Sequence, residues 1–395
     1  MRRPLYVAAG GGGDALAAAL LHRAFQRSGS PVITTFSWDR LIVDPLPGPR
    51  SVRDFTGLGT MNGLSNVVNL RTRPIPPAGS TLPALAGSLT GQLDATLVLL
   101  DATGGVVDLH RQLASHVAAA SADGVVLVDV GGDVLAIGLE PGLRSPLGDA
   151  LVLAAVDGLD VPSIVWVAGP GVDGELPARY VLSRLESVGA TSKGRVPRET
   201  SDLALPILRW HPSEATALFV AAARGVRGIV DIRSGGMPVR LDGDSSLVLE
   251  ARHDRVVEAA PLAQRIRTTE SLTAADSIVS DACGRSEMAF ETAKAASRSL
   301  GRDKIELDFT LLTSYVRQAE IDGVTHATYR RIAELTGARD TAVVRDLLLA
   351  RWPDSEDCCL WRLPSTNAMS PSRGENGPLL ETFPIDDLKT KRGVG

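Results

Sequence analysis

This sequence has few aromatic residues and no excess of positive charge. Aromatic side chains make up only 4% of the 395 residues, which disfavours a surface that stacks on nucleic acid bases. The formal net charge is −5, so no global basic field would attract nucleic acid or anionic lipid. We therefore expect a small-molecule substrate rather than a nucleic acid or a membrane as the partner, and we leave a homo-oligomer open.

Cysteine and long apolar runs are scarce as well. Cys358 and Cys359 are adjacent, Cys283 is isolated and no Cys-x-x-Cys occurs, so we expect reduced thiols. The longest apolar stretches, such as residues 150–156, are far short of the about 20 residues that cross a bilayer. The first residues lack the uninterrupted apolar core of a signal peptide, and we expect a cytoplasmic protein.

Short runs of Val, Ile and Leu alternate with Ala-rich segments of helical length from Pro4 to about Ile232. This alternation is typical of repeated βαβ units and predicts an α/β fold with a doubly wound, mostly parallel sheet of Rossmann-like type. The predicted strands are residues 5–9, 32–36, 95–100, 125–130, 163–167 and 228–232. The predicted helices are residues 14–27, 107–120, 146–157, 177–187 and 213–223. Between residues 37 and 93 we predict one strand, 66–70, in a Pro- and Gly-rich segment that is functional or partly disordered.

Changes in composition divide the chain into three parts. Residues 1–280 are expected to form the Rossmann-like domain that carries the site, with a hairpin or edge strands in residues 240–258. Residues 281–364 are expected to form a C-terminal helical region. Its predicted helices are residues 286–300, 309–320, 326–335 and 341–352. Residues 365–395 are rich in Ser, Pro, Asn, Gly and charges, and we expect a disordered tail.

Two Gly-Gly-Asp elements, each directly after a predicted strand, are the most informative motifs. The first lies within residues 10–14 and ends at Asp14, and the second covers residues 131–133 and ends at Asp133. The carboxyl ends of parallel strands share one rim of an open sheet, where ligands bind. We therefore expect Asp14 and Asp133 to lie together at an active site on that rim.

The first loop, with four consecutive glycines, exposes backbone N–H groups to a ligand. It also fits a degenerate dinucleotide fingerprint, with Asp39 as a candidate ribose-binding acid, but a four-glycine run fits many patterns. Asp14 would place a negative charge where a pyrophosphate should rest. Asp14 is therefore interpreted as an N-cap, as a ligand of a divalent cation, or as a partner of a cationic amine.

The second loop concentrates charged residues between a strand and a helix. Clustered acids raise one another's pKa, so one of Asp133 and Glu140 could act as a general acid while the other stays ionised, unless both bind a metal ion. Arg144 could bind a carboxylate or phosphate, or form a salt bridge with Glu140. Ser145 precedes Pro146 and fits an N-cap, and Asp149 favours the dipole of the following helix.

Four segments carry a resemblance to a known family: Ala9-Gly-Gly-Gly-Gly-Asp14-Ala, residues 37–50, residues 129–149, and Val172-Asp173-Gly-Glu175-Leu-Pro. With these segments the chain resembles the domain-of-unknown-function 1152 family, from the N-terminus to the helices near Glu287. The resemblance implies a fold and the location of a site rather than a reaction. It also directs attention to four residues of the long loop, which are Trp38, Arg40, Asp44 and Arg50.

Together these observations predict an enzyme that acts on an anionic metabolite, bearing phosphate or carboxylate and derived from an amino acid or a nucleotide. Transfer, hydrolysis and elimination are all left open. The predicted catalytic residues are Asp14, Asp133 and Glu140, and a divalent metal ion, if one is the cofactor, would bind Asp14 and Asp133. The predicted substrate-binding residues are Gly11, Gly12, Gly13, Trp38, Arg40, Asp44, Arg50, Gly132, Arg144 and Ser145. The six histidines are scattered, and we keep only His211 as a reserve acid or base.

The alternative hypothesis is a ligand-sensing regulator that binds DNA. Residues 332–337, followed by a second helix that carries Thr341 and Arg345, fit a helix-turn-helix. A helical hairpin that covers the sheet fits the same pattern. The positive charge of this stretch is largely offset by neighbouring acids, which disfavours DNA binding. The basic residues are Arg330, Arg331, Arg339 and Arg345, and the acids are Glu334, Asp340 and Asp346.

Overall fold

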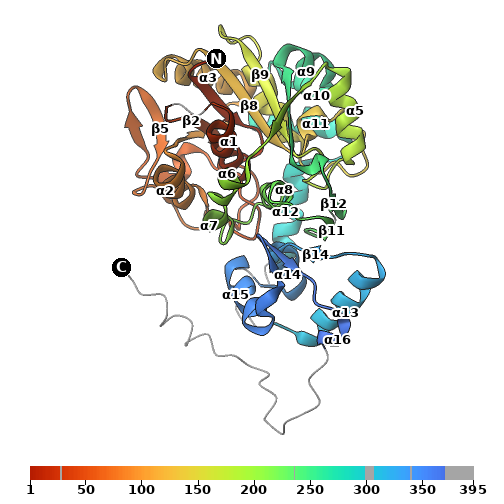
Figure 1. Ribbon diagram of the computed structural model, residues 1–395. Coiled ribbons are helices and arrows are strands. Elements are labelled where there is room, and N and C mark those ends of the chain that lie inside the picture. The colour runs from red at the N-terminus through yellow and green to blue at the C-terminus, as the bar shows by residue number, and fades with distance from the viewer. Residues whose placement is uncertain (27–28, 235, 299–306, 339, 370–395) are drawn as a thin grey trace.

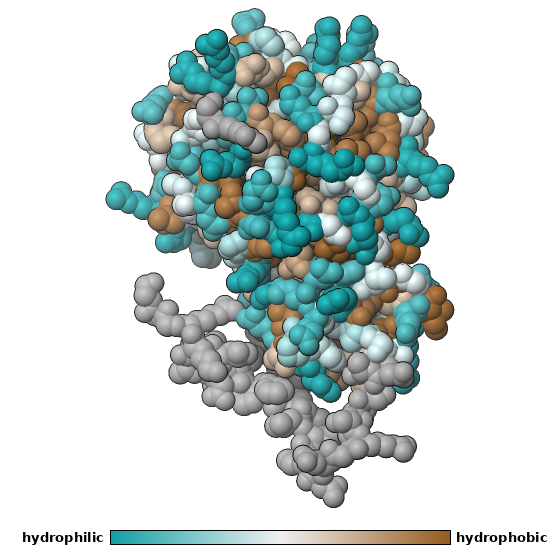
Figure 2. Space-filling view, in the orientation of Figure 1, coloured by the Kyte–Doolittle hydropathy of each residue, from teal (hydrophilic) through white to brown (hydrophobic). Residues whose placement is uncertain are grey.

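The computed structural model describes residues 1–26, 29–234, 236–298, 307–338 and 340–369. Figure 1 shows a large α/β body and a smaller C-terminal unit, drawn in blue, that packs against one end of it. Figure 2 shows a face covered mainly by hydrophilic side chains, with smaller hydrophobic areas among them. None of the helices in the described part of the chain combines the length and the apolar composition needed to span a bilayer.

The main sheet has nine strands in the order β10-β13-β9-β8-β1-β2-β7-β5-β4. Its five central strands are parallel: β1 (Pro4–Ala8), β2 (Val32–Phe36), β7 (Thr96–Leu100), β8 (Gly124–Val130) and β9 (Ser163–Ala168). Its edges are antiparallel: β4 (Gly59–Met61), β5 (Leu64–Val68), β10 (Thr191–Arg195) and β13 (Leu247–Arg252). The predicted α/β fold with a mostly parallel sheet is confirmed.

Helices cover both faces of this sheet (Figure 1). One face packs against α1 (Gly12–Phe25), α2 (Leu82–Leu93), α6 (Arg198–Asp202), α7 (Leu205–Leu208) and α8 (Glu214–Ala223). The other packs against α3 (Gly105–Ala119), α4 (Pro146–Val156), α5 (Ala178–Ser187), α9 (His253–Ala259), α10 (Pro261–Ile266) and α11 (Leu272–Cys283). Tyr6 and Ala8 of β1 face the first layer, and Leu5 and Val7 face the second. Burial on both faces explains why the central strands are continuous apolar runs.

A second sheet lies between the α/β body and the C-terminal helices. Its strands, in the order β12-β11-β14-β16-β15, are β12 (Val239–Leu241), β11 (Gly228–Asp231), β14 (His326–Ala327), β16 (Leu360–Arg362) and β15 (Glu356–Asp357). Residues 228–232 form the predicted strand, β11, but the prediction that it continues the main sheet is wrong. The strand β11 pairs with β14 instead of a strand of the main sheet; the pairing is parallel, with Val230 opposite His326. Of the two alternatives for residues 240–258, the hairpin is wrong, because β12 and β13 join different sheets; β12 is an edge strand of the second sheet, whereas β13 lies next to the edge strand β10 of the main sheet.

The C-terminal unit combines these short strands with helices. The helices are α12 (Glu287–Arg298), α13 (Phe309–Ile321), α14 (Tyr329–Thr336), α15 (Thr341–Arg351) and α16 (Thr366–Met369). Thr328 caps α14 by accepting a hydrogen bond from the Arg331 N–H, so the helix begins three residues later than predicted. Most of the predicted tail, residues 370–395, lies outside the described residues.

The segment between residues 37 and 93 contains more regular structure than predicted. In addition to β4 and β5 it forms the helix α2 and a small two-stranded sheet of β3 (Phe55–Thr56) and β6 (Arg73–Pro74). Short 3₁₀ helices complete the fold: η1 (Val52–Asp54), η2 (Asp133–Leu135), η3 (Asp244–Ser246) and η4 (Pro353–Ser355). The segment between residues 37 and 93 therefore folds as part of the α/β body, next to β2 and β7 of the main sheet.

Candidate functional site

A cleft with a volume of about 160 Å³ opens at the carboxyl ends of the parallel strands. The loops that follow β1, β2, β8 and β9 supply most of its walls, together with the first turns of α1, α4 and α8. The second sheet and the C-terminal helices supply Arg233, Glu287 and Arg330. Asp14 and Asp133 both line this cleft, because parallel strands bring their following loops to one rim.

The cleft brings together some of the predicted site residues and not others. Those that line it are Gly11, Gly12, Gly13, Asp14, Trp38, Arg40, Asp133 and Ser145. Those that lie outside its lining are Asp44, Arg50, Gly132, Glu140 and Arg144. The lining also contains acids that were not predicted as site residues, which are Asp129, Asp149, Asp173, Glu175, Glu214 and Glu287, and it contains Asp39.

Asp14 belongs to the first turn of α1, but it is not the N-cap of that helix. The helix begins at Gly12 with Gly11 at the N-cap, so Asp14 is its third residue. Its Oδ2 accepts a hydrogen bond of 2.6 Å from the Gly10 N–H. Burial raises the pKa of Asp14 to about 7, against the lowering effect of nearby backbone N–H groups. The carboxyl can therefore gain or lose a proton near neutral pH.

Glycine at position 13 is required by the close approach of α8. A Cβ at Gly13 would lie 2.2 Å from Oγ of Ser213, at the beginning of that helix. The Gly-rich loop thus allows α8 to pack against α1 and to bring His211 and Glu214 to the edge of the cleft. A side chain at this position would push the two helices apart.

Asp129, Asp133 and Asp149 form an acidic triad at the end of β8. One carboxylate oxygen from each residue can be chosen so that all three lie within 4.8 Å of one another. Asp129 is 1% exposed and Asp149 is 4% exposed. Burial, together with repulsion from neighbouring carboxylates, raises the pKa of all three well above the ordinary range. Oδ1 of Asp149 has no hydrogen-bond partner.

Asp173 and Glu175 follow β9 and differ in their surroundings. Glu175 accepts hydrogen bonds from the N–H groups of Arg144 and Ser145, and from the Ser145 hydroxyl at 2.5 Å. It also pairs with Arg233 at 2.9 Å. Burial opposes ionisation, but Arg233 and these hydrogen bonds lower the pKa of Glu175 below its ordinary value.

Asp173, by contrast, has an Oδ2 atom that is buried without a hydrogen-bond partner. Burial and repulsion from Glu175 raise the pKa of Asp173 to about 7. Gly131, with a φ of 126°, leaves room for this side chain, since a Cβ there would lie 2.6 Å from Oδ2 of Asp173. The Gly-Gly-Asp motif after β8 therefore permits Asp173 to approach the triad.

The prediction that the Ser145 hydroxyl caps α4 is wrong. Ser145 occupies the N-cap position and Pro146 begins the helix, but the hydroxyl donates to Glu175 instead of accepting from the helix. Oε2 of Glu287, from α12, accepts the Leu147 N–H at 3.2 Å. A carboxylate from the C-terminal unit thus satisfies a free donor in the first turn of α4.

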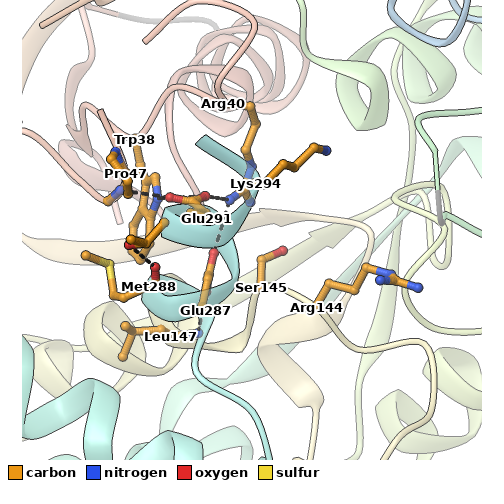
Figure 3. Close-up of polar contacts among 12 residues, drawn as sticks. Trp38, Arg40, Pro47, Arg144, Ser145, Leu147, Glu287, Met288, Glu291 and Lys294 are labelled. Carbon is orange, nitrogen blue, oxygen red and sulfur yellow. Dashed lines mark hydrogen bonds and ion pairs between the residues drawn. The ribbon is translucent and has the colours of Figure 1, made fainter. Parts of the chain in front are cut away.

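Trp38 and Arg40 attach the long loop to α12. Arg40 pairs with Glu287 at 3.1 Å and with Glu291 at 2.7 Å, and the Trp38 indole N–H donates to Glu291. Figure 3 shows both glutamates reaching from α12 toward Arg40, with Lys294 close by and Arg144 pointing away. Arg40 therefore faces the cleft with its charge already balanced by two acids.

Asp44 and Arg50 form a buried ion pair inside the same loop. Nε of Arg50 lies 3.0 Å from Oδ2 of Asp44, which is fully buried. The N–H groups of Leu46 and Gly79 donate to the other oxygen of Asp44, and Arg50 donates to the Gly48 carbonyl at 2.7 Å. This pair holds the shape of the loop behind the cleft.

Glu140 and Arg144 are not partners in the described part of the chain. Glu140 accepts hydrogen bonds from the N–H groups of Ile137 and Gly138 and from the Tyr180 hydroxyl at 2.7 Å. Burial opposes ionisation, but these donors lower the pKa of Glu140. Arg144 lines a smaller neighbouring cavity, and its Nε is buried without a hydrogen-bond partner. The alternative of a salt bridge between them is wrong, and Glu140 stabilises its own loop.

His211 brings a neutral ring to the cleft. Its Nδ1 accepts a hydrogen bond from the Ser213 N–H at 3.3 Å, so its Nε2 carries the proton. That Nε2 atom is buried without a partner and lies next to the Gly-rich loop, 3.0 Å from where a Cβ at Gly12 would be. Burial lowers the pKa of His211 to about 4. His211 is therefore a neutral hydrogen-bond donor at neutral pH rather than a cation.

Two arginines of the cleft were not predicted to belong to it: Arg233 gave no signal in the sequence, and Arg330 was assigned to the possible helix-turn-helix. Arg233 follows β11 and pairs with Glu175, and Arg330 in α14 lies 3.6 Å from Glu214. Overall, nine carboxylates and three arginines line the cleft. Since each arginine already has at least one acidic partner, the lining has a clear excess of acid. This composition suits metal binding, proton transfer or recognition of a positively charged group.

Three comparisons with known proteins bear on this site. A family model described as "Protein of unknown function (DUF1152)" matches residues 5–295, a range that contains every predicted site residue. No curated protein and no solved structure matches the chain. The resemblance found in the four sequence segments is confirmed, and the chain belongs to the DUF1152 family.

Proposed function

We propose that this chain is an enzyme that acts on a small anionic metabolite in the cleft at the carboxyl ends of the strands. The observation that carries the proposal is the cleft of about 160 Å³, in which the Gly-rich loop of residues 10–13 faces a wall of nine carboxyls. Burial raises the pKa of two of these carboxyls, Asp14 and Asp173, to about 7. A general acid or base is most effective when its pKa lies near the working pH, and perturbed groups of this kind cluster at functional sites.

The anionic part of the substrate would rest against the open N–H groups of the Gly-rich loop, residues 10–13. His211 Nε2 would donate to a substrate oxygen from the α8 side of the cleft, and Arg233 or Arg330 would face it from the C-terminal unit. The proposed metabolite carries phosphate or carboxylate and derives from an amino acid or a nucleotide. The reaction is a transfer, a hydrolysis or an elimination that uses Asp14 as the acid or base.

A combined binding and turnover screen tests this proposal. Full-length protein is exposed to a panel of phosphate- and carboxylate-bearing metabolites, and melting temperature and product formation are both measured. We expect at least one metabolite to raise Tm by mass action and to be converted. Asp14→Asn should keep that Tm shift and lower kcat by about 10² to 10⁴ fold.

Asp101→Asn is the matched control, because Asp101 also follows a parallel strand, β7, but lies outside the cleft lining. This variant should keep both binding and turnover. A panel without any Tm shift, or full turnover by Asp14→Asn, would contradict the proposed function.

Finer features of the fold and of the protein's location are also part of the proposal. A Rossmann-like sheet is supported by the spatial order β7-β2-β1-β8-β9, in which the connections reverse direction between β1 and β8, beside the cleft. We propose a cytoplasmic location, a small-molecule partner and a helical character for the C-terminal region, and a homo-oligomer stays open.

The alternative function, a DNA-binding regulator, has less support. Three arginines of the predicted helix-turn-helix have acidic partners: Arg330 with Glu214 and Glu334, Arg331 with Asp231, and Arg345 with Glu356. Arg339 lies outside the described residues. A gel-shift series at rising salt distinguishes the two functions, because DNA binding through phosphate contacts weakens steeply with salt.

A further inference from the structure

The acidic triad, Asp129, Asp133 and Asp149, draws its members from three consecutive elements. Asp129 lies in β8, Asp133 begins η2, and Asp149 lies in the first turn of α4. Their carboxylate oxygens lie within 4.8 Å of one another. Three carboxylate oxygens at this spacing are close enough to coordinate one ion with small side-chain adjustments.

The triad has no counter-charge within the described residues. No Lys, Arg or His of those residues forms an ion pair with Asp129, Asp133 or Asp149, whereas Glu175 and Glu287 in the same cleft each pair with an arginine. The contact found for Asp129 is a 3.2 Å hydrogen bond from the Val134 N–H. Buried carboxylates are normally paired or bound to a metal, because unpaired burial of charge is costly.

Two buried carboxylate oxygens in and beside the triad have unused acceptor capacity. Oδ1 of Asp149 and Oδ2 of Asp173 are both buried without a hydrogen-bond partner, in residues that are 4% and 7% exposed. Asp173 is not a member of the triad. It packs against Gly131, which lies between Asp129 and Asp133 in the chain. The unpaired oxygen of Asp173 is thus an observation independent of the triad itself.

We propose that Asp129, Asp133 and Asp149 bind one divalent cation of the magnesium class, with Asp173 facing its open side. Carboxylate ligands without thiol or imidazole favour Mg²⁺ or Mn²⁺ over zinc. Mg²⁺ usually keeps several positions for water and substrate phosphate, so the ion would bridge the acidic wall to an anionic metabolite. The role given to the ion rests on the proposed function. Its binding to the triad does not.

The site differs from the one expected from sequence, in which Asp14 and Asp133 shared the metal. Asp14 lines the same cleft but is not a member of the group whose oxygens lie within 4.8 Å of one another. Asp149 takes its place because α4, which carries it, packs against η2 and β8. Asp14 is left free for the proton transfer proposed above.

Binding of Mn²⁺ to the full chain, measured by electron paramagnetic resonance and by competition with Mg²⁺, tests the inference without any substrate. We expect one Mn²⁺ per chain, displaced by Mg²⁺. Asp149→Asn and Asp133→Asn should each weaken binding by at least about tenfold. Glu140→Gln is the matched control, because Glu140 lies in the same connection but outside the cleft, and it should bind Mn²⁺ as the wild type does.

Thermal unfolding separates a metal ligand from a merely structural acid. In metal-free buffer at pH 8, Asp149→Asn should melt at the same temperature as the wild type or higher, since it removes a repelling charge. Addition of Mg²⁺ should then raise Tm for the wild type and for Glu140→Gln, but not for Asp149→Asn. A structural role would instead lower Tm of the variant with and without the ion.

Two results would overturn the inference: no Mn²⁺ binding by the wild type at millimolar concentration, or equal Mn²⁺ affinity in wild type, Asp133→Asn and Asp149→Asn. Either result leaves the proposed enzyme standing if a metabolite is still converted. Conversely, Mn²⁺ binding that depends on the triad, combined with a panel that yields no turnover, supports the cation site and contradicts the enzyme.

Discussion

Asp14 and Glu175 are both buried acids of one cleft, yet their surroundings favour opposite charge states at neutral pH. Glu175 accepts two backbone N–H groups and the Ser145 hydroxyl and pairs with Arg233, so its ionised form is stabilised. Asp14 has no arginine within ion-pair distance among the described residues, and its pKa is about 7. Local donors therefore decide which acid carries a charge and which can carry a proton.

The protonation of Asp14 predicts how stability depends on pH. The carboxyl has a pKa of about 7 in the folded protein and 3.8 as its ordinary value, so the folded state holds the proton more tightly. Its contribution to stability is complete below about pH 4 and is lost as the pH rises through 7, by up to about 4 kcal/mol. Asp14→Asn removes this loss.

Urea unfolding at pH 5, 6.5 and 8 without divalent ions checks this prediction. The free energy of unfolding of Asp14→Asn, relative to the wild type, should rise from pH 5 to about pH 7 and level off by pH 8. Asp322→Asn, which changes an exposed acid of the C-terminal unit, is the control. Its free energy of unfolding should differ from that of the wild type by the same amount at all three pH values. Parallel curves for Asp14→Asn would show that the carboxyl is ionised throughout.

At the scale of secondary-structure elements, α12 is the connection between the two parts of the site. Through Glu287 it satisfies the first turn of α4, and through Glu291 it binds Trp38, Arg40 and the Gly48 N–H. The side chain of Glu291 is 8% exposed, so these partners take the place of water around its carboxylate. The long loop that follows β2 therefore keeps its place on the cleft because α12 packs over it.

Glu291→Ala should release this loop. The variant leaves the N–H groups of Trp38 and Gly48 without their acceptor, which costs about 1 to 3 kcal/mol, whereas the lost charge matters less because the Arg40 side chain is 39% exposed. We expect faster amide hydrogen exchange in residues 37–50 and a matching loss of unfolding free energy. Thr292→Ala, at the next and exposed position of α12, is the control. Unchanged exchange in residues 37–50 would contradict the role given to α12.

At the scale of the whole molecule, Glu214 joins the α/β body to the C-terminal unit. It accepts hydrogen bonds from the Arg233 N–H at 2.9 Å and the Thr328 hydroxyl at 2.5 Å, and it lies 3.6 Å from Arg330. Arg233 follows β11, Thr328 is the N-cap of α14, and Arg330 lies in α14. Two of the three arginines of the cleft, Arg233 and Arg330, are thus positioned by the same residue that holds the two parts together.

Glu214→Ala should loosen the C-terminal unit more than the α/β body. We expect the free energy of unfolding to fall by about 3 to 5 kcal/mol, because the variant breaks a buried ion pair. Hydrogen exchange should become faster in residues 326–338 than in β1 and β8. Asp322→Ala, which removes an exposed acid of the C-terminal unit, should leave exchange in both parts unchanged. Equal acceleration in both parts would indicate general destabilisation instead of a junction.

The central strands and most long helices could be predicted from sequence, because burial on two faces demands continuous apolar runs. The helix α2 was missed because it contains Pro83, Gly87 and Gly91, which are typical of loops. Pro83 is tolerated there because it lies in the first turn, where no helical hydrogen bond is lost. Pairing of β11 with β14 was also missed, since nothing near Gly228 in the chain indicates a partner almost 100 residues later.

Gly-rich turns after apolar strands are local signals, so the parallel arrangement that brings Asp14 and Asp133 to one rim could be predicted from the sequence. Which acids are paired and which have no counter-charge depends on contacts that form only in the folded chain. Arg233 and Glu287 reach the cleft from elements with no local motif, and Arg330 reaches it from a segment whose pattern suggested DNA binding. The spacing of Asp129, Asp133 and Asp149 depends on how α4 packs on β8. Charge state and coordination depend on distances across the fold, which no single stretch of sequence encodes.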